Sequence, residues 1–189
     1  MKRVGLFGGT FDPLHIGHMI VAESVREAEG LDEVWFIPSH IPPHKEKAST
    51  GSSDRYHMVK DSIETNDNFK VTDVELEGEE RSFTLTTVRE LKKQYPETQF
   101  SFIIGGDMVE SLHTWYKIEE LIKEVSFIGV SRPGYSFDAP YELSKVEVPL
   151  LEISSSEVRK RLKRNKTVRY MVPEPVYSYI KRKGLYGYK

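Results

Sequence analysis

The sequence predicts an α/β protein built on a doubly wound, mostly parallel sheet. Short apolar runs alternate along the chain with stretches of helical periodicity, which is typical of βαβ units. Three of these runs, residues 34–37, 102–104 and 127–130, are almost uniformly apolar, as strands buried on both faces of a sheet are. A glycine-rich turn joins the first apolar run to the first helical stretch. Since crossovers between parallel strands are right-handed, the order of elements favours a Rossmann-like sheet.

Each expected element is bounded by residues that start or stop regular structure. The apolar runs predict strands over residues 2–7, 33–38, 69–76, 99–104, 125–131 and 146–153. Helical patterns predict helices over residues 16–29, 54–65, 82–95, 119–123, 154–163 and 173–183. Gly30 and Gly184 are expected to end two helices, Pro96 to stop a third, and Ser154 with Glu157 to form a capping box. Residues 39–53 contain two prolines and a glycine and predict a long loop.

Composition narrows the classes of protein that the chain can be. A length of 189 residues predicts a single domain, 1–189, with a small C-terminal helical portion at about 154–189. The formal net charge of -2 gives no general attraction to nucleic acid or anionic lipid. The chain has no cysteine, which excludes disulfides, cysteine-based zinc sites and a cysteine nucleophile. No signal peptide or membrane span fits the pattern, so a cytoplasmic location is expected.

Residues 8–18, Gly-Gly-Thr-Phe-Asp-Pro-Leu-His-Ile-Gly-His, carry the strongest functional signal. Gly8 and Gly9 let a ligand approach the backbone, and the start of the following helix favours phosphate. His15 and His18 are three residues apart and share a face if both are helical. Thr10 either donates to phosphate or caps the turn, and a local side-chain bond from Asp12 is expected to shape that turn. The segment therefore predicts a phosphate cradle with two imidazoles directed at the ligand.

Other sites that contain glycine or histidine fit this segment less well. The glycine spacing is not that of a dinucleotide fingerprint, and the lysine of a Walker A loop is missing. His15 and His18 have the spacing of a zinc pair, but a catalytic zinc normally needs a third protein ligand. The remaining histidines are scattered along the chain. The plainest alternative is a tight strand–helix turn that carries two surface histidines.

The pattern Gly-x-Phe-Asp-Pro-x-His-x-Gly-His resembles the signature of the nucleotidyltransferase superfamily, and it implies a Rossmann-like nucleotidyltransferase fold. Over essentially its full length, the chain also resembles the bacterial nicotinate-nucleotide adenylyltransferases. The segments that carry this resemblance, besides residues 8–18, are residues 42–45, 82–84 with 87, 104–108, 115–116, 132–134 and 153–156 with 159. Departures are mild: Phe83, Gly106 and Ser156 stand where the family often has Tyr, Ala and Thr.

The resemblance implies adenylyl transfer from ATP to nicotinate mononucleotide in NAD biosynthesis, by direct in-line attack and with release of pyrophosphate. It implies that His18 and His15 are catalytic and donate hydrogen bonds to phosphate. The residues expected at ATP and its phosphates are Gly8, Gly9, Thr10, Phe11, Gly105, Asp107, Arg132, Ser154, Ser155 and Arg159. Those expected at the nicotinate nucleotide are Lys45, Thr84, Trp115 and Tyr116. Mg²⁺ is expected to arrive with ATP, because no carboxylate cluster predicts a protein-held metal.

Residue chemistry fits these roles, although each residue also has a structural alternative. Guanidinium groups at Arg132 and Arg159 can clamp phosphate oxygens, whereas Lys45 is equally compatible with a solvated side chain. Ser154, Ser155 and Asp107 also suit helix caps. The Trp115-Tyr116 pair offers rings for a pyridine or for packing. A helix start at Thr84 would attract the carboxylate that distinguishes nicotinate from nicotinamide.

Two alternative functions stay open on the sequence. One is a different adenylyltransferase of the superfamily, specific for nicotinamide mononucleotide or for phosphopantetheine. The other is a nucleotide-binding module without turnover. All of these alternatives take small molecules as partners, with no nucleic acid and no membrane, and a homodimer is also left open.

Overall fold

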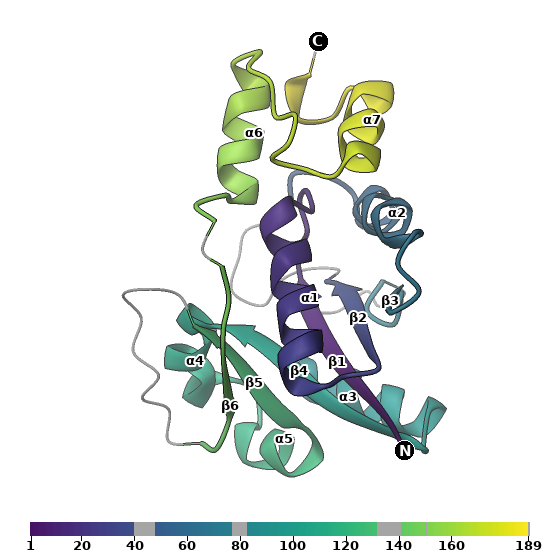
Figure 1. Ribbon diagram of the computed structural model, residues 1–189, viewed down its shortest axis with the longest axis vertical. Helices are drawn as coiled ribbons and strands as arrows, with labels where there is room; N and C mark the ends of the chain where they lie inside the picture. Colours follow the sequence, from purple (N-terminus) through teal and green to yellow (C-terminus); the bar gives the residue numbers. More distant parts are fainter. Residues whose placement is uncertain (40–47, 77–82, 132–140, 150, 189) are drawn as a thin grey trace.

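A computed structural model describes residues 1–39, 48–76, 83–131, 141–149 and 151–188 (Figure 1). Within these residues, six strands form one parallel sheet in the order β3-β2-β1-β4-β5-β6. The strands are β1 Lys2–Gly9, β2 Glu33–Pro38, β3 Phe69–Val71, β4 Thr98–Gly105, β5 Ser126–Ser131 and β6 Ser144–Glu147. The helices are α1 Ile16–Glu29, α2 Ser52–Ile63, α3 Thr84–Gln94, α4 Gly106–Ser111, α5 Ile118–Glu124, α6 Ser155–Lys163 and α7 Glu174–Lys183. Two single 3₁₀ turns are η1 Leu112–Thr114 and η2 Leu185–Gly187.

The strand order confirms the doubly wound fold class. The chain runs outward from β1 through β2 to β3, then returns to place β4 on the other side of β1. In such sheets ligands bind beyond the carboxyl ends of the strands, at the point where the winding reverses. Here that point lies between β1 and β4, which end at Gly9 and Gly105. The fold therefore brings the first glycine turn and the Gly105-Gly106-Asp107 segment to the same edge of the sheet.

Apolar side chains fill two layers, one on each face of the sheet. Val34 and Phe36 of β2 pack with α1 and α2, whereas Trp35 and Ile37 pack with α3 and its neighbours. This alternation follows from the two-residue repeat of a strand. It explains why the strand sequences are apolar almost throughout rather than at alternate positions. None of the helices in the described ranges has both the length and the apolar character needed to span a membrane.

Two expected strands differ from the structure, and one helix was not expected. The strand expected over 69–76 ends at Val71, because residues 73–76 fold into a turn closed by the bond from Leu76 N to Asp73 O. The strand expected over 146–153 is instead β6, which begins at Ser144 and ends before Pro149, a residue without an N–H for the ladder. A short helix that is not among the expected elements, α4, begins at Gly106 directly after β4.

The C-terminal helices α6 and α7 lie together at one end of the molecule, beyond the sheet edge where β1 ends (Figure 1). A buried tyrosine fastens α7 to α2: the hydroxyl of Tyr179 donates to Asp54 Oδ1 at 2.8 Å. Burial, together with this bond to a carboxylate, raises the pKa of Tyr179 to about 12. The contact therefore stabilises the fold only while the phenol keeps its proton.

We expect this tyrosine to contribute to alkaline unfolding. Between its unfolded pKa of about 10 and its folded pKa of about 12, the unfolded chain releases a proton that the folded protein retains. The free energy of unfolding then falls as the pH rises, by at most about 1.4 kcal/mol per pH unit from this group. Urea unfolding of the wild type and Tyr179→Phe over this pH range measures the effect. Parallel pH dependences of the two proteins would contradict it.

Candidate active site

The turn between β1 and α1, residues 10–13, is shaped by one buried aromatic ring. Phe11 has a φ of +48°, which few residues other than glycine adopt, and its side chain is buried. The ring lies against Gly9, where an added Cβ would come within 2.8 Å of it. Gly9 is therefore required by the packing of Phe11, in addition to any ligand contact.

His15 and His18 form a stacked pair at the start of α1. Their ring centroids are 3.6 Å apart with an angle of 26° between the planes, and Phe11 meets the His18 ring edge-on at 5.1 Å. The backbone N–H of His15 donates to His18 Nδ1 at 3.1 Å. Because an amide N–H only donates, Nδ1 accepts, and the proton of the neutral ring is on Nε2. His18 is thus held as a hydrogen-bond donor through Nε2.

Asp12 receives partners from distant parts of the chain. Its carboxylate accepts from the hydroxyl of Tyr186 and from the backbone N–H of Ser49, both at 2.7 Å. These contacts replace the local side-chain bond that the sequence predicted for Asp12. Burial raises the pKa of Tyr186 above its usual range, and the bond to Asp12 raises it further, so the phenol stays protonated at neutral pH.

Arg55 of α2 lies behind the same turn and is 1% exposed. Its guanidinium donates to Thr10 O at 2.6 Å and to Thr50 O at 3.2 Å. Burial lowers the pKa of Arg55, while the nearby Asp12 opposes that shift. A buried cation therefore sits beside the buried Asp12 carboxylate, as buried charges generally require.

Two side chains of α6 approach the other side of the turn. Ser155 Oγ donates to Pro13 O at 2.9 Å, and Arg159 Nη1 donates to Asp12 O at 2.7 Å. Ser154 is the N-cap of α6 and accepts from Glu157 N at 3.1 Å, which confirms the Ser154 half of the expected capping box. An open surface hollow of about 370 Å³ lies along α6 and shares Arg159 with this contact. Its described lining is one hydroxyl and four cations: Ser156, Arg159, Lys160, Lys163 and Arg164. Its charge suits an anionic ligand.

The end of β4 completes this edge of the sheet. Gly105 is the N-cap of α4, and Asp107 lies in its first turn with an exposed side chain. A Cβ on Gly105 would come within 2.8 Å of Asp107 Oδ1, so the carboxylate folds back over the strand end. Asp107 therefore presents acceptors beside the point where the winding of the sheet reverses.

A second group of predicted residues gathers at the start of α3. Thr84 is the first residue of that helix, and its neighbour Phe83 packs against Tyr116, with 4.4 Å between ring centroids. Both rings are solvent-accessible, Phe83 at 36% and Tyr116 at 50%. Trp115 instead packs edge-on against Phe102 and Phe127, with centroid distances of 6.0 and 6.1 Å. The fold thus brings the Thr84 and Trp115-Tyr116 segments together.

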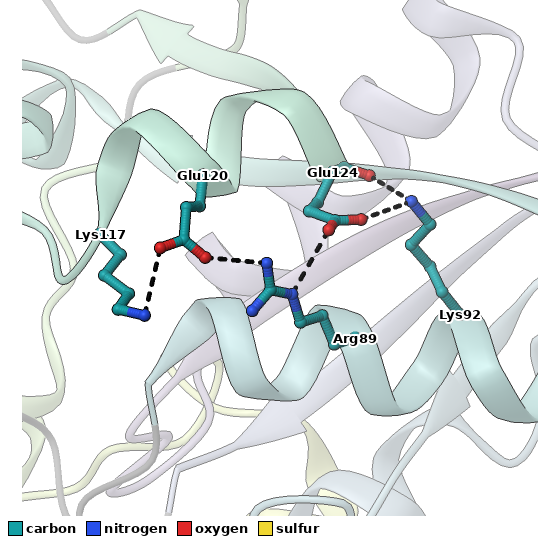
Figure 2. A network of polar contacts seen from close by, with 5 residues as sticks. All are labelled: Arg89, Lys92, Lys117, Glu120 and Glu124. Carbon is teal, nitrogen blue, oxygen red and sulfur yellow. Dashed lines mark hydrogen bonds and ion pairs between the residues drawn. The ribbon is translucent and has the colours of Figure 1, made fainter.

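A polar network joins α3 to α5 close to this group (Figure 2). Arg89 donates to Glu120 at 2.9 Å and to Glu124 at 3.3 Å, while Lys92 meets Glu124 and Lys117 meets Glu120. These side chains are partly exposed, so each pair adds little stability on its own. The network links α3 to α5 next to the second group, because Lys117 directly follows Tyr116.

Comparison with known proteins assigns the chain to a family. Residues 6–161 match the family model described as cytidylyltransferase-like. The chain is 47% identical to the nicotinate-nucleotide adenylyltransferase of Bacillus subtilis, over 98% of this chain and 99% of the relative. It is 46% identical to a protein of Oceanobacillus iheyensis named probable nicotinate-nucleotide adenylyltransferase, over 100% and 98% of the two chains. The chain belongs to the nicotinate-nucleotide adenylyltransferases.

Solved structures of similar fold include the nicotinic acid mononucleotide adenylyltransferase of Plasmodium falciparum complexed with NaAD. That chain is 23% identical, has a TM-score of 0.84, and the match covers 100% of this chain and 99% of the other. A second structure of the Plasmodium protein, complexed with APC, has a TM-score of 0.82 at the same identity and coverage. At this identity the likeness confirms the Rossmann-like nucleotidyltransferase fold.

Most residues predicted for the site can be placed in this member of the family. The glycine turn, the histidine pair, Gly105 with Asp107, and α6 with Ser155 and Arg159 belong to elements that end or begin at one edge of the sheet. Thr84, Trp115 and Tyr116 form the second group. Lys45 and Arg132 fall outside the described residues, so their predicted roles stay predictions. The substrate contacts of the other residues likewise stay predictions.

Sequence reasoning missed Arg55 and Tyr186. One signal for Arg55 was available, because it shares the apolar face of α2 with Met58, Val59 and Ile63, where a surface arginine would not be placed. A cation on an apolar face indicates a buried partner. Tyr186 lies near the C-terminal end in a glycine-flanked segment, and nothing local in the sequence marks it as part of the site.

Proposed function

We propose that this chain transfers the adenylyl group of ATP to nicotinate mononucleotide by direct in-line attack. The observation that carries the proposal is the His15–His18 pair, which holds an Nε2–H donor where β1 meets the start of α1. An oriented neutral donor suits charge that develops on an α-phosphate oxygen. The full-length relationship to nicotinate-nucleotide adenylyltransferases supports the choice of reaction.

In the proposed step, a phosphate oxygen of nicotinate mononucleotide attacks the α-phosphorus of ATP. A new P–O bond forms as the bond from the α-phosphorus to the bridging oxygen of the β-phosphate breaks, and pyrophosphate leaves with that electron pair. The attacking phosphate is already anionic at neutral pH, so no general base is required. Catalysis then depends on positioning and on neutralising charge, which His18, His15 and the cations of α6 are suited to do.

We place ATP along the edge of the sheet formed by the ends of β1 and β4. Gly8, Gly9, Thr10 and Phe11 would border its phosphates, with Ser154, Ser155 and Arg159 of α6 facing them. Asp107 would accept from a ribose hydroxyl or from the adenine amine near Gly105. Mg²⁺ would enter as the ATP complex, because in nucleotide sites this ion is held largely by substrate phosphates and water.

The nicotinate nucleotide would bind at the start of α3. The free amides of a first helical turn attract a carboxylate, and Thr84 lies in that turn. Trp115 or Tyr116 would contact the pyridine ring. This assignment explains a preference for nicotinate over nicotinamide by charge alone.

The experiment that tests the function is pyrophosphate release. The protein is incubated with Mg-ATP and, separately, nicotinate mononucleotide, nicotinamide mononucleotide or phosphopantetheine. We expect release with nicotinate mononucleotide and much less with the other two. Pyrophosphate release mainly with nicotinamide mononucleotide or phosphopantetheine would assign the chain to that substrate instead. No release with any of the three acceptors would mean that the chain is a nucleotide-binding module without turnover.

A further inference from the structure

A buried polar cluster lies behind the turn between β1 and α1, and the proposed chemistry does not use it. Asp12 lies in the turn, Arg55 in α2 and Tyr186 in η2, as many as 174 positions apart in the chain, and each of these residues is at most 9% exposed. Removing such charged and polar groups from water costs free energy that ordinary packing would avoid. We therefore expect the cluster to hold the turn in one position as well as to stabilise the fold.

The cluster bonds to the turn at two of its residues, Thr10 and Asp12, and Arg55 also donates to Thr50 O outside the turn. Tyr186 donates to the Asp12 side chain, Arg55 to the carbonyl of Thr10, and Arg159 to the carbonyl of Asp12. The turn is thereby held at its backbone and at its only buried carboxylate, immediately before His15. A shift of the turn would move the amide of His15, which is the group that fixes His18 Nδ1.

Two of the five described non-glycine residues with positive φ lie at this contact: Tyr186 is one of its partners, and Phe11 precedes the other, Asp12. Phe11 and Tyr186 both have positive φ values, of +48° and +58°, in a region that disfavours residues with a side chain. Such strain persists only where the surrounding contacts enforce it. The bond from Tyr186 to Asp12 links one strained segment directly to the other.

We propose that Tyr186 is a positioning residue for adenylyl transfer, acting through Asp12 on the turn that holds His15 and His18. The C-terminal turn η2 is then part of the active-site framework, although it lies far from the reacting atoms in sequence. This inference rests on the proposed function. It predicts that loss of the phenol hydroxyl affects the transition state more than substrate binding.

The test is Tyr186→Phe, with Tyr179→Phe as a matched control. Both tyrosines are buried, and each donates to one carboxylate, at 2.7 Å for Tyr186 and 2.8 Å for Tyr179. Only Tyr186 bonds to the turn, whereas Tyr179 bonds to Asp54 of α2. We expect kcat of Tyr186→Phe to fall by about 10- to 100-fold with KM changed by less than about threefold. Tyr179→Phe should keep the wild-type kcat at neutral pH.

A second measurement is independent of turnover. The ¹⁵N shifts of the His18 ring report its tautomer, and the wild type should show the proton on Nε2. Tyr186→Phe should move these shifts toward an averaged tautomer, and Tyr179→Phe should not. Wild-type kcat and His18 shifts in Tyr186→Phe would overturn the inference, as would equal losses in both variants. An inactive wild type would refute the proposed function, while the shifts would still test the positioning.

Discussion

Replacing His18 with alanine is expected to lower kcat by about 10²- to 10³-fold, or about 2.7–4 kcal/mol of activation free energy. The reason is that His18 is fixed before substrate arrives: the amide of His15 occupies Nδ1, and the stacked ring of His15 restricts its rotation. A donor held in this way needs no reorganisation when charge develops on the α-phosphate. Steady-state kinetics with Mg-ATP and nicotinate mononucleotide measure the effect, and KM should change far less than kcat.

His18 also caps α1, so the control must separate catalysis from folding. His18→Asn retains an acceptor close to the position of Nδ1 and can still bond to the amide of His15, but it lacks the Nε2 donor. We expect His18→Asn to recover most of the stability lost in His18→Ala, which is about 1 kcal/mol for a cap, and to stay as inactive. If His18→Asn were active, the His18 ring would only cap α1 and would not donate to the phosphate.

Elements determined by local pattern could be predicted from the sequence. The helix expected over 16–29 is α1, because an amphipathic stretch ends at Gly30, whose φ of +60° few other residues adopt. The N-cap at Ser154 is also present, because its hydroxyl needs only the amide of Glu157, three residues along the chain. The short helix α4 was missed, since two glycines before Asp107 indicate a turn more strongly than a helix.

The framework of the site could not be predicted, because it depends on contacts between remote segments. The glycine and histidine motif marks where phosphate should bind, but not what holds the turn. Tyr186 and Asp12 are 174 positions apart in the chain, so the fold of the residues between them decides whether they meet. Ser155 and Arg159, predicted as phosphate contacts, also bond to the carbonyls of Pro13 and Asp12, a role that no local pattern indicates.

Thr84→Pro is expected to reduce the preference for nicotinate over nicotinamide mononucleotide by about tenfold. Proline is well tolerated at the first position of a helix, and Phe83 already has the extended backbone that a following proline requires, with φ of -103° and ψ of 135°. The substitution therefore removes one amide donor at the start of α3 without breaking the helix. A hydrogen bond to a charged group contributes about 1.5–3 kcal/mol, against about 0.5–1.5 kcal/mol for a neutral one. The carboxylate should thus lose more than the carboxamide.

Thr84→Ala is the matched control, because it removes the hydroxyl and keeps the amide. If the backbone recognises the carboxylate, the ratio of kcat/KM for the two mononucleotides stays close to wild type in Thr84→Ala and falls in Thr84→Pro. The opposite order would assign recognition to the hydroxyl. An unchanged ratio in both would move the selection of nicotinate away from α3, and the exposed ring of Tyr116, paired with Phe83, would become the next group to test.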